Sequence, residues 1–222
     1  MSLILNFETS SKNCSVTLSS EGKLISNFDL EDDKYRHSEL LTSTIKDILT
    51  QNNISAKELS AVAIGIGPGS FTGLRIGFSV AKGLCYPHKI NLIGISSLKI
   101  LANSLKNDSG DIIPMINDKG NFYYLSTFEY GLNEVGTPLI DQVDSNFINR
   151  NIKENSTIVV NNKESFEYIN SIINDQVKLQ YKPISSINMI DLSYASFIQQ
   201  KFEDLPYFDP LYVKKPYVTQ IP

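Results

Sequence analysis

The chain has 222 residues, of which 41% are hydrophobic and 20% are charged. This composition is typical of a folded globular protein and argues against disorder, a collagen-like repeat or a coiled coil. Twenty Lys and Arg residues against 24 Asp and Glu residues give a net charge of −4. Because phosphate neutralisation supplies most of the affinity of autonomous nucleic-acid-binding proteins, any RNA in the biology of this chain is expected to be held by another molecule.

The two cysteines and the apolar segments indicate a cytoplasmic protein that does not contact a membrane. Cys14 and Cys85 lie in neither a CxxC motif nor a disulfide framework, so we predict two buried thiols in a reducing compartment. The N-terminal segment lacks the basic region of a signal peptide, and Glu8 interrupts its apolar run. The longest apolar stretch, residues 61–67, is far shorter than the roughly 18 residues of a membrane span.

Hydrophobic periodicity in the first half predicts three strands, followed by alternating helices and strands. A period of two residues indicates strands, and apolar side chains on one side indicate helices. In chain order we predict strands at residues 3–8, 14–19 and 23–29, a helix at 38–52, a helical turn at 55–58, a strand at 61–66, a helix at 72–84, a strand at 91–95 and a helix at 96–105. This order has the layout of a ribonuclease-H-like lobe, in which helices cover a mixed α/β sheet.

A polar stretch at residues 107–111 divides the chain into a first lobe at 1–106 and a smaller second lobe at 107–222. The second lobe is predicted to contain strands at 112–116, 122–128 and 157–160 and helices at 146–151 and 164–173. Its order of elements resembles that of the first lobe, but it is smaller and less regular. The last predicted helix, at 187–201, is expected either in the second lobe or packed back on the first.

The strongest local motif is the glycine-rich run at residues 65–77. Such a loop before a helix can cradle a phosphate, because glycines permit positive φ and the helix N-terminus offers free N–H groups. A P-loop needs Gly-Lys-Ser/Thr where Gly73-Leu74-Arg75 stands, and Ser70 and Pro68 break the dinucleotide-binding pattern. The alternative is a tight structural turn that allows close helix packing. Its residues would be Gly67, Gly69, Gly73 and Gly77.

The residues needed for common catalytic and metal sites do not occur together in recognisable motifs. His37 and His88 have no partner at ligand spacing, and neither HxxxH nor HExxH is present, so no metal site is predicted. A GxSxG nucleophile elbow is absent as well, and we assign no catalytic residue. His37 precedes Ser38 and Glu39 at a helix start, which favours a capping or interface role.

Several segments resemble one bacterial family in order and spacing. The main ones are Glu8-Thr9-Ser10, residues 37–41 and the run at 67–77, with shorter matches at 81–84, 94–98 and 210–214. The family is TsaB, also called YeaZ, a component of the machinery that makes N6-threonylcarbamoyladenosine on tRNA. The likeness is strong over residues 4–105 and reaches the second half only at its hairpin and its tail.

This resemblance implies a two-lobed fold of the actin, Hsp70 and sugar-kinase type, without a catalytic site or a cofactor of its own. It implies pairing with the catalytic paralogue TsaD, joint action with the ATPase TsaE, and contact with tRNA only through the complex. Whether a nucleotide binds at the subunit interface stays open. In the ATPases of this fold the turn after the first strand holds phosphate and metal, so Glu8 is either a relic of that site or part of a turn in which Thr9, Ser10 and Ser11 satisfy backbone groups.

The sequence departs from the usual family pattern at three places. Glu8 stands where Asp is usual, Asn117-Asp118-Lys119 where Asp-Ala-Arg is common, and Tyr212-Val213-Lys214 where many members have Tyr-Leu-Arg. The second and third departures leave the role of the second lobe open.

The helices at 38–52 and 72–84 carry more apolar surface than one sheet contact requires, so we expect them to bind the TsaD-type partner as half of a four-helix interface. The expected partner-binding residues are His37, Leu41, Ile45, Ile48, Leu74, Phe78 and Lys82. The alternative is that these side chains form the core of the chain itself. Without a partner, the same surface is expected to form a homodimer.

Two other functions compete with the non-catalytic scaffold subunit. One is an autonomous actin-like ATPase or kinase, and the other, ranked last, is a peptidase.

Overall fold

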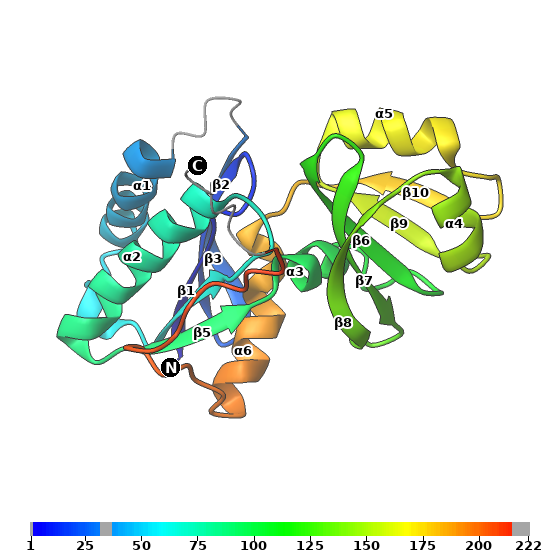
Figure 1. Cartoon of the computed structure of the whole chain (residues 1–222). Helices are drawn as coiled ribbons and strands as arrows, with labels where there is room; N and C mark the ends of the chain where they lie inside the picture. The colour runs from blue at the N-terminus through cyan, green and yellow to red at the C-terminus, as the bar shows by residue number, and fades with distance from the viewer. Residues whose placement is uncertain (1, 32–36, 215–222) are drawn as a thin grey trace, which may run out of the picture.

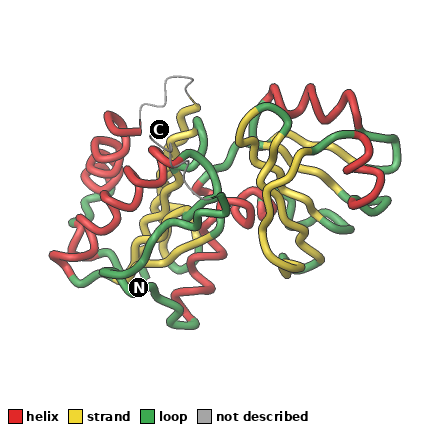
Figure 2. Tube along the Cα trace, viewed as in Figure 1, coloured by secondary structure: helices red, strands yellow, loops and turns green. Residues whose placement is uncertain are grey.

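A computed structural model describes residues 2–31 and 37–214 of the chain. Figures 1 and 2 show two lobes, each built around its own five-stranded sheet and joined by short segments. The two-lobed α/β architecture expected from the sequence is confirmed. Within the described ranges, no helix combines the length and the apolar character needed to cross a bilayer.

The first sheet has the strand order β3-β2-β1-β4-β5. Its central strand, β1 (Leu3–Glu8), pairs antiparallel with β2 (Asn13–Ser20) and parallel with β4 (Ala61–Gly65). The edge strands are β3 (Lys23–Glu31) and β5 (Asn91–Ile95). All residues of β1 and β4 are buried, which explains why β4 has a continuous apolar sequence rather than an alternating one. In β1 the buried residues include the polar Asn6 and Glu8.

Helices cover both faces of the first sheet. Leu5 and Phe7 of β1 pack in the cluster that includes α1 (His37–Gln51) and α2 (Phe71–His88), whereas Ile4 packs in another cluster on the opposite face. This alternation is the two-residue period of a strand. The opposite face is covered by α3 (Ser97–Asn103), the 3-10 turn η2 (Ser186–Met189) and α6 (Ile190–Ile198), and a further 3-10 turn, η1 (Ala56–Glu58), precedes β4. Thus α6, which contacts β1 and β5, lies on the first lobe.

The second sheet repeats the topology of the first. Its order, β10-β9-β6-β7-β8, becomes β8-β7-β6-β9-β10 when it is followed from the other edge, which matches β3-β2-β1-β4-β5 strand for strand. The sequence pattern predicts three of these strands but neither β8 nor β10, so the second sheet is wider than expected. The elements are β6 (Ile112–Lys119), β7 (Phe122–Glu129), β8 (Asn133–Gln142), α4 (Ser145–Asn151), β9 (Thr157–Val160), α5 (Lys163–Ile172) and β10 (Lys178–Tyr181).

One hydrophobic cluster belongs to both lobes and has α3 at its centre. From the first sheet it takes Ile4 and Ile93, and from the second sheet it takes Phe128 and Val159. Leu101 of α3 is fully buried in the same cluster. Domains that move relative to each other usually meet at small, polar interfaces. A continuous apolar core between the two sheets therefore favours one fixed arrangement of the lobes.

Candidate functional site: the glycine turn and the interlobe cleft

The glycine-rich run forms the connection between β4 and α2. The hydroxyl of Ser70 accepts a hydrogen bond from the Gly73 amide at 3.2 Å and caps the first turn of α2. The Ser70 amide donates to the carbonyl of Ser10 at 2.7 Å, which ties this turn to the one after β1. Gly67 and Gly69 have φ values of +98° and +153°, and the Gly67–Pro68 peptide bond is cis. Side chains rarely tolerate such φ values, so the turn requires glycine at both positions.

The glycines at the start of α2 allow the helix to touch the turn after β1. A Cβ on Gly73 would lie 2.0 Å from the Thr9 carbonyl oxygen, and one on Gly77 would lie 2.5 Å from Thr9 Oγ1. A Cβ on Gly69 would lie 2.4 Å from the carbonyl oxygen of Ser10. This crowding accounts for the glycines by close packing of the chain against itself, which is the structural alternative considered for this motif.

The Glu8 carboxylate is buried beneath the same turn. Its Oε1 accepts hydrogen bonds from the amides of Thr9 at 2.8 Å and Ser10 at 2.6 Å, and its Oε2 accepts one from the Ser97 hydroxyl at 2.9 Å. A Cβ on Gly65 would meet Oε2, so the glycine there makes room for the carboxylate. Burial raises the pKa of Glu8 even though these hydrogen bonds favour the charged form. These three hydrogen bonds give the carboxylate a structural role, since they hold the turn together.

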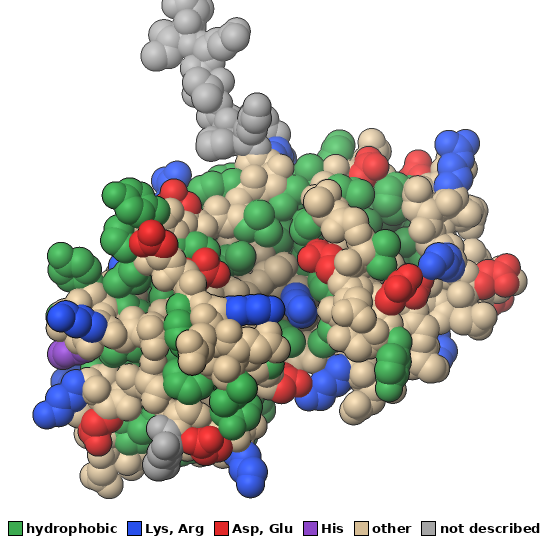
Figure 3. All heavy atoms as spheres, turned by 90° about the horizontal axis from the view of Figure 1, so that it is seen from below, with side chains coloured by type: hydrophobic (Ala, Val, Ile, Leu, Met, Phe, Trp, Pro, Cys, Tyr) green, Lys and Arg blue, Asp and Glu red, His purple; other side chains and the backbone are tan. Residues whose placement is uncertain are grey.

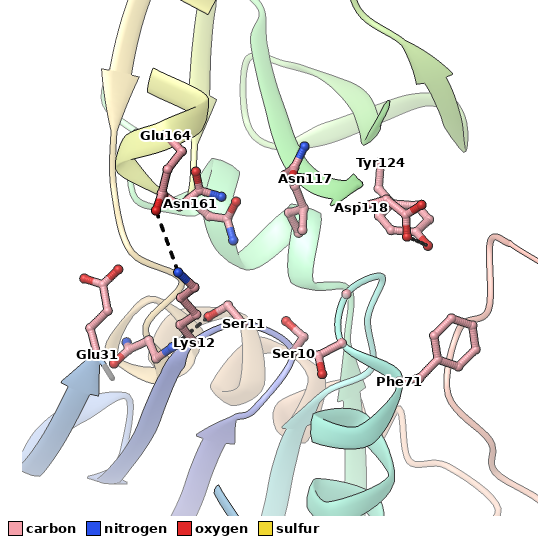
Figure 4. A pocket seen from close by; sticks show the side chains of 15 residues that line it. Ser10, Ser11, Lys12, Glu31, Phe71, Asn117, Asp118, Tyr124, Asn161 and Glu164 are labelled. Atoms are coloured by element: carbon pink, nitrogen blue, oxygen red, sulfur yellow. Dashed lines mark hydrogen bonds and ion pairs between the residues drawn. The ribbon is translucent and has the colours of Figure 1, made fainter. Parts of the chain in front are cut away.

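A cleft of ≈ 400 Å³ lies between the lobes (Figure 4). Its wall on the first lobe includes Lys12 and Phe71, and its wall on the second lobe includes Asn117, Asp118 and Glu164. The polar side chains come from the turn after β1, the end of β6 and the start of α5. Among the described residues, no group of three His, Cys, Asp or Glu side chains is placed to hold a metal ion.

Polar contacts join the two walls of the cleft. Lys12 Nζ lies 3.8 Å from Glu164 Oε1. The Tyr181 hydroxyl donates to Glu31 Oε2 at 2.9 Å. Burial and the Glu31 carboxylate raise the pKa of Tyr181 to about 12, so its hydroxyl keeps its proton. Glu31 of the first lobe and Glu164 of the second lobe therefore each contact a side chain of the other lobe.

Comparisons with known proteins identify the family. The model of TsaD, tRNA N6-adenosine threonylcarbamoyltransferase, matches residues 31–209. The tRNA threonylcarbamoyladenosine biosynthesis protein TsaB of Buchnera aphidicola subsp. Acyrthosiphon pisum is 31% identical over 175 residues, covering 76% of this chain and 78% of that protein. The chain belongs to the TsaB family. The TsaB of Escherichia coli is 34% identical over 128 residues, but this match covers only 57% of the present chain and 54% of the relative.

Solved structures support the fold of this TsaB-family chain. YeaZ from Pseudomonas aeruginosa superposes with a TM-score of 0.80 at 20% identity and covers 96% of this chain and 100% of that chain. An inorganic polyphosphate/ATP-glucomannokinase from an Arthrobacter strain superposes with a TM-score of 0.55 at 9% identity, with coverages of 90% and 100%. At these identities the comparisons establish a shared two-lobed fold. The resemblance found in the sequence is thus confirmed at the level of family and fold.

The prediction of partner-binding residues on α1 and α2 is wrong for the apolar side chains. These side chains point inward, because the apolar stripe of each helix packs on the first sheet, and Leu41 is fully buried. They belong to the core that the sequence analysis gave as the alternative. The residues concerned are Leu41, Ile45, Ile48, Leu74 and Phe78.

The two polar residues of the predicted set also make contacts within this TsaB-family chain. His37 is buried, and its Nε2 lies 2.7 Å from the Ser11 carbonyl oxygen, which ties the start of α1 to the turn after β1. Burial lowers the pKa of His37. Lys82 is half-buried and donates to the carbonyl of Pro206 at 3.4 Å.

A second apolar stripe, which was not predicted from the sequence, flanks the inward stripe of α2 and packs at the edge of the same core. Ile76, Val80 and Leu84 recur every four residues and are half-buried, and Leu40 on α1 is half-buried as well. The four-residue spacing was the available signal. The sequence alone does not separate this stripe from the inward stripe, because both follow the same helical period.

Proposed function

We propose that the chain is a non-catalytic scaffold subunit of the complex that installs N6-threonylcarbamoyl on adenosine 37 of tRNA. In this proposal it pairs with a TsaD-type catalytic subunit, works with a TsaE-type ATPase and carries no cofactor of its own. Support comes from its likeness to both members of the pair. Besides the TsaB proteins, a tRNA N6-adenosine threonylcarbamoyltransferase of Anoxybacillus flavithermus is 29% identical over 102 residues, which cover 45% of this chain and 30% of that protein.

In the same proposal, tRNA reaches the chain only through the complex. The net charge of −4 supports this arrangement, because a chain that holds RNA alone needs a concentrated basic surface. On the face shown in Figure 3, acidic and basic side chains are interspersed.

The observation that carries the pairing is the half-buried stripe that flanks the inward stripe of α2, since its side chains pack at the edge of the first core and keep part of their surface exposed. We define the pairing face as Leu40, Ile76, Val80 and Leu84, which lie on two helices in contact with each other on the outer side of the first lobe. Exposed Ser79 and Gly83 lie beside this stripe and leave room for another helix to approach closely. A matching helix pair on the partner would complete a four-helix interface. In isolation, the pairing face would form an isologous homodimer.

The test is co-elution of the chain with a TsaD-type protein in size-exclusion chromatography. Ile76→Asp places a charge in the pairing face and is expected to abolish co-elution without changing the circular dichroism spectrum. Leu24→Asp is the matched control, since Leu24 is a 49% exposed apolar residue on β3 of the same lobe. If Ile76→Asp and Leu24→Asp both co-elute like the wild type, α2 does not supply the interface.

An assay of tRNA modification with and without the chain tests the function itself. Modification that proceeds equally well without the chain would contradict the scaffold role. Mass photometry of the isolated chain at micromolar concentration tests the homodimer, which Ile76→Asp is expected to dissociate.

The ATPase alternative derives support from the fold shared with the glucomannokinase. Calorimetry with ATP and the isolated chain decides between the two proposals. Tight binding would favour an autonomous ATPase or kinase, whereas the scaffold proposal expects no binding until the partner is added. Proteolysis that a single substitution abolishes would be needed to support a peptidase.

A further inference from the structure

The segment that follows α6 runs back across the first lobe and then reaches the second lobe. We call residues 203–214 the strap; it is coloured orange to red in Figure 1. The Glu203 amide donates to the carbonyl of Leu92 at 2.9 Å. Further along, the Phe208 ring packs against Phe78 with a centroid distance of 5.3 Å. These contacts fix the first part of the strap over β5 and α2.

The strap next covers the glycine turn. The Leu211 amide donates to the carbonyl of Ile66 at 2.8 Å. One residue later, the Tyr212 ring stacks on Phe71, with centroids 4.9 Å apart and planes inclined by 10°. Because Phe71 is the first residue of α2, the stacked pair connects the strap directly to the N-terminal turn of that helix.

The last residue of the strap, Lys214, contacts the second lobe. Lys214 Nζ donates to Asp118 Oδ2 at 2.6 Å, and the Tyr124 hydroxyl donates to Asp118 Oδ1 at 3.0 Å. The Lys214 and Asp118 side chains are only 25% and 19% exposed, so water screens this pair less than an ion pair on the open surface.

We propose that the strap is a positioning element that joins the second lobe to the first turn of α2. Asp118 holds Lys214, the backbone of the strap carries this constraint to Tyr212, and Tyr212 packs on Phe71. The strap thereby orders the start of the helix that supplies the pairing face, although its stacking and ion-pair residues lie outside that face. The second lobe thus acts on partner binding through the strap. This last step rests on the proposed function, whereas the ordering of α2 does not.

Hydrogen exchange of the full chain tests the ordering of α2. Asp118→Asn and Tyr212→Leu each remove one link of the strap, and both are expected to speed amide exchange at residues 71–76 roughly fivefold. Residues 80–85 of the same helix should exchange as in the wild type. Asp111→Asn is the matched control, because Asp111 is also 19% exposed and pairs with Lys153 at 2.9 Å away from the strap.

Unchanged exchange at residues 71–76 in both strap variants would overturn the proposal. So would an equal increase along the whole of α2, since this would show a general loss of stability instead of a local one. If amide exchange at residues 71–76 became as fast in Asp111→Asn as in Asp118→Asn, the proposal would also be overturned, since this too would show a general loss of stability.

Titration with the TsaD-type partner tests the consequence for binding. Asp118→Asn is expected to weaken binding about as much as it speeds exchange, and Asp111→Asn is expected to leave binding unchanged. Faster exchange with unchanged affinity would overturn the effect of the strap on pairing. If the wild-type chain does not bind the partner at all, the proposed function fails, but the exchange experiment still decides whether the strap orders α2.

Discussion

The Thr9 hydroxyl donates a hydrogen bond to the Gly73 carbonyl at 2.9 Å, and the Thr9 carbonyl occupies the space that a Cβ on Gly73 would need. The turn after β1 and the first turn of α2 are thus in direct backbone contact. This contact explains why glycine occurs in the run without requiring a bound phosphate.

Two glycines of α2 should respond oppositely to replacement by alanine. Gly73→Ala is expected to lower the free energy of unfolding by about 3 kcal/mol, because the new methyl group overlaps the Thr9 backbone. Gly83→Ala is expected to raise it by about 1 kcal/mol, since no atom lies within 4 Å of that Cβ and alanine favours the helix. Urea denaturation followed by circular dichroism measures both. Equal stabilities of the two variants would contradict the close contact between α2 and Thr9.

Glu8 should make the chain less stable as the pH rises. Burial raises its pKa above the ordinary value of 4.5, so between the unfolded and the folded pKa the native state binds more protons than the unfolded chain. The free energy of unfolding contributed by Glu8 therefore falls across that interval. Glu8→Gln keeps an oxygen acceptor for the Thr9 and Ser10 amides and cannot ionise.

The measurement is the melting temperature of wild type and Glu8→Gln from pH 5 to pH 8. The variant is expected to gain stability relative to the wild type as the pH increases. A constant difference between the two curves would show that the Glu8 carboxyl does not titrate in this range.

Both cysteines should be unreactive in the native protein. They are buried free thiols, as the sequence analysis predicts. Burial raises the pKa of Cys14 to about 11, with a contribution from Asp29, and that of Cys85 to about 12. Because the thiolate is the reactive form, a thiol reagent at pH 8 is expected to label neither residue until denaturant is added. Ser79→Cys, on the exposed side of α2, should react at once, and fast labelling of the native wild type would contradict the burial.

The lobes should unfold together. Phe128 lies in the second sheet and is fully buried in the cluster that both lobes share. Phe128→Ala is expected to cost about 3–5 kcal/mol and to lower the stability of β1 and β4 along with that of β6 and β7. Calorimetry should give one transition for wild type and variant, and hydrogen exchange in the variant should quicken in both sheets alike. Two resolved transitions would show that the lobes fold separately.

The elements that could be predicted from the sequence are those with a clear local pattern of apolar residues. Residues 61–65 form a continuous apolar run, and the helix from residue 37 to 51 carries a regular stripe. In contrast, β8 is exposed almost throughout and contains Gly136 and Pro138. It forms through its pairing with β7 at the edge of a sheet, where proline is tolerated, and no local pattern records that pairing.

The error on the pairing helices has a similar physical origin. An apolar stripe on a helix shows that one side avoids water, but a sheet of the same chain and a second protein satisfy this requirement equally well. Leu41 and Ile76 are both apolar, and only the fold shows that the first is fully buried whereas the second is half-buried at the edge of the same core. The contact between Asp118 and Lys214 could not be predicted either, because it depends on the path of the strap.

Since Met189 and Phe208 complete the clusters on the two faces of the first sheet, the lobe that begins the chain is finished by residues that leave the ribosome late. The second sheet, from Ile112 to Tyr181, is continuous in sequence and can close before them. During synthesis the core of the first lobe is therefore completed only after the whole second sheet has been made, although domains usually form in order from the N-terminus. Until these late residues are added, part of the apolar surface on both faces of the first sheet stays uncovered.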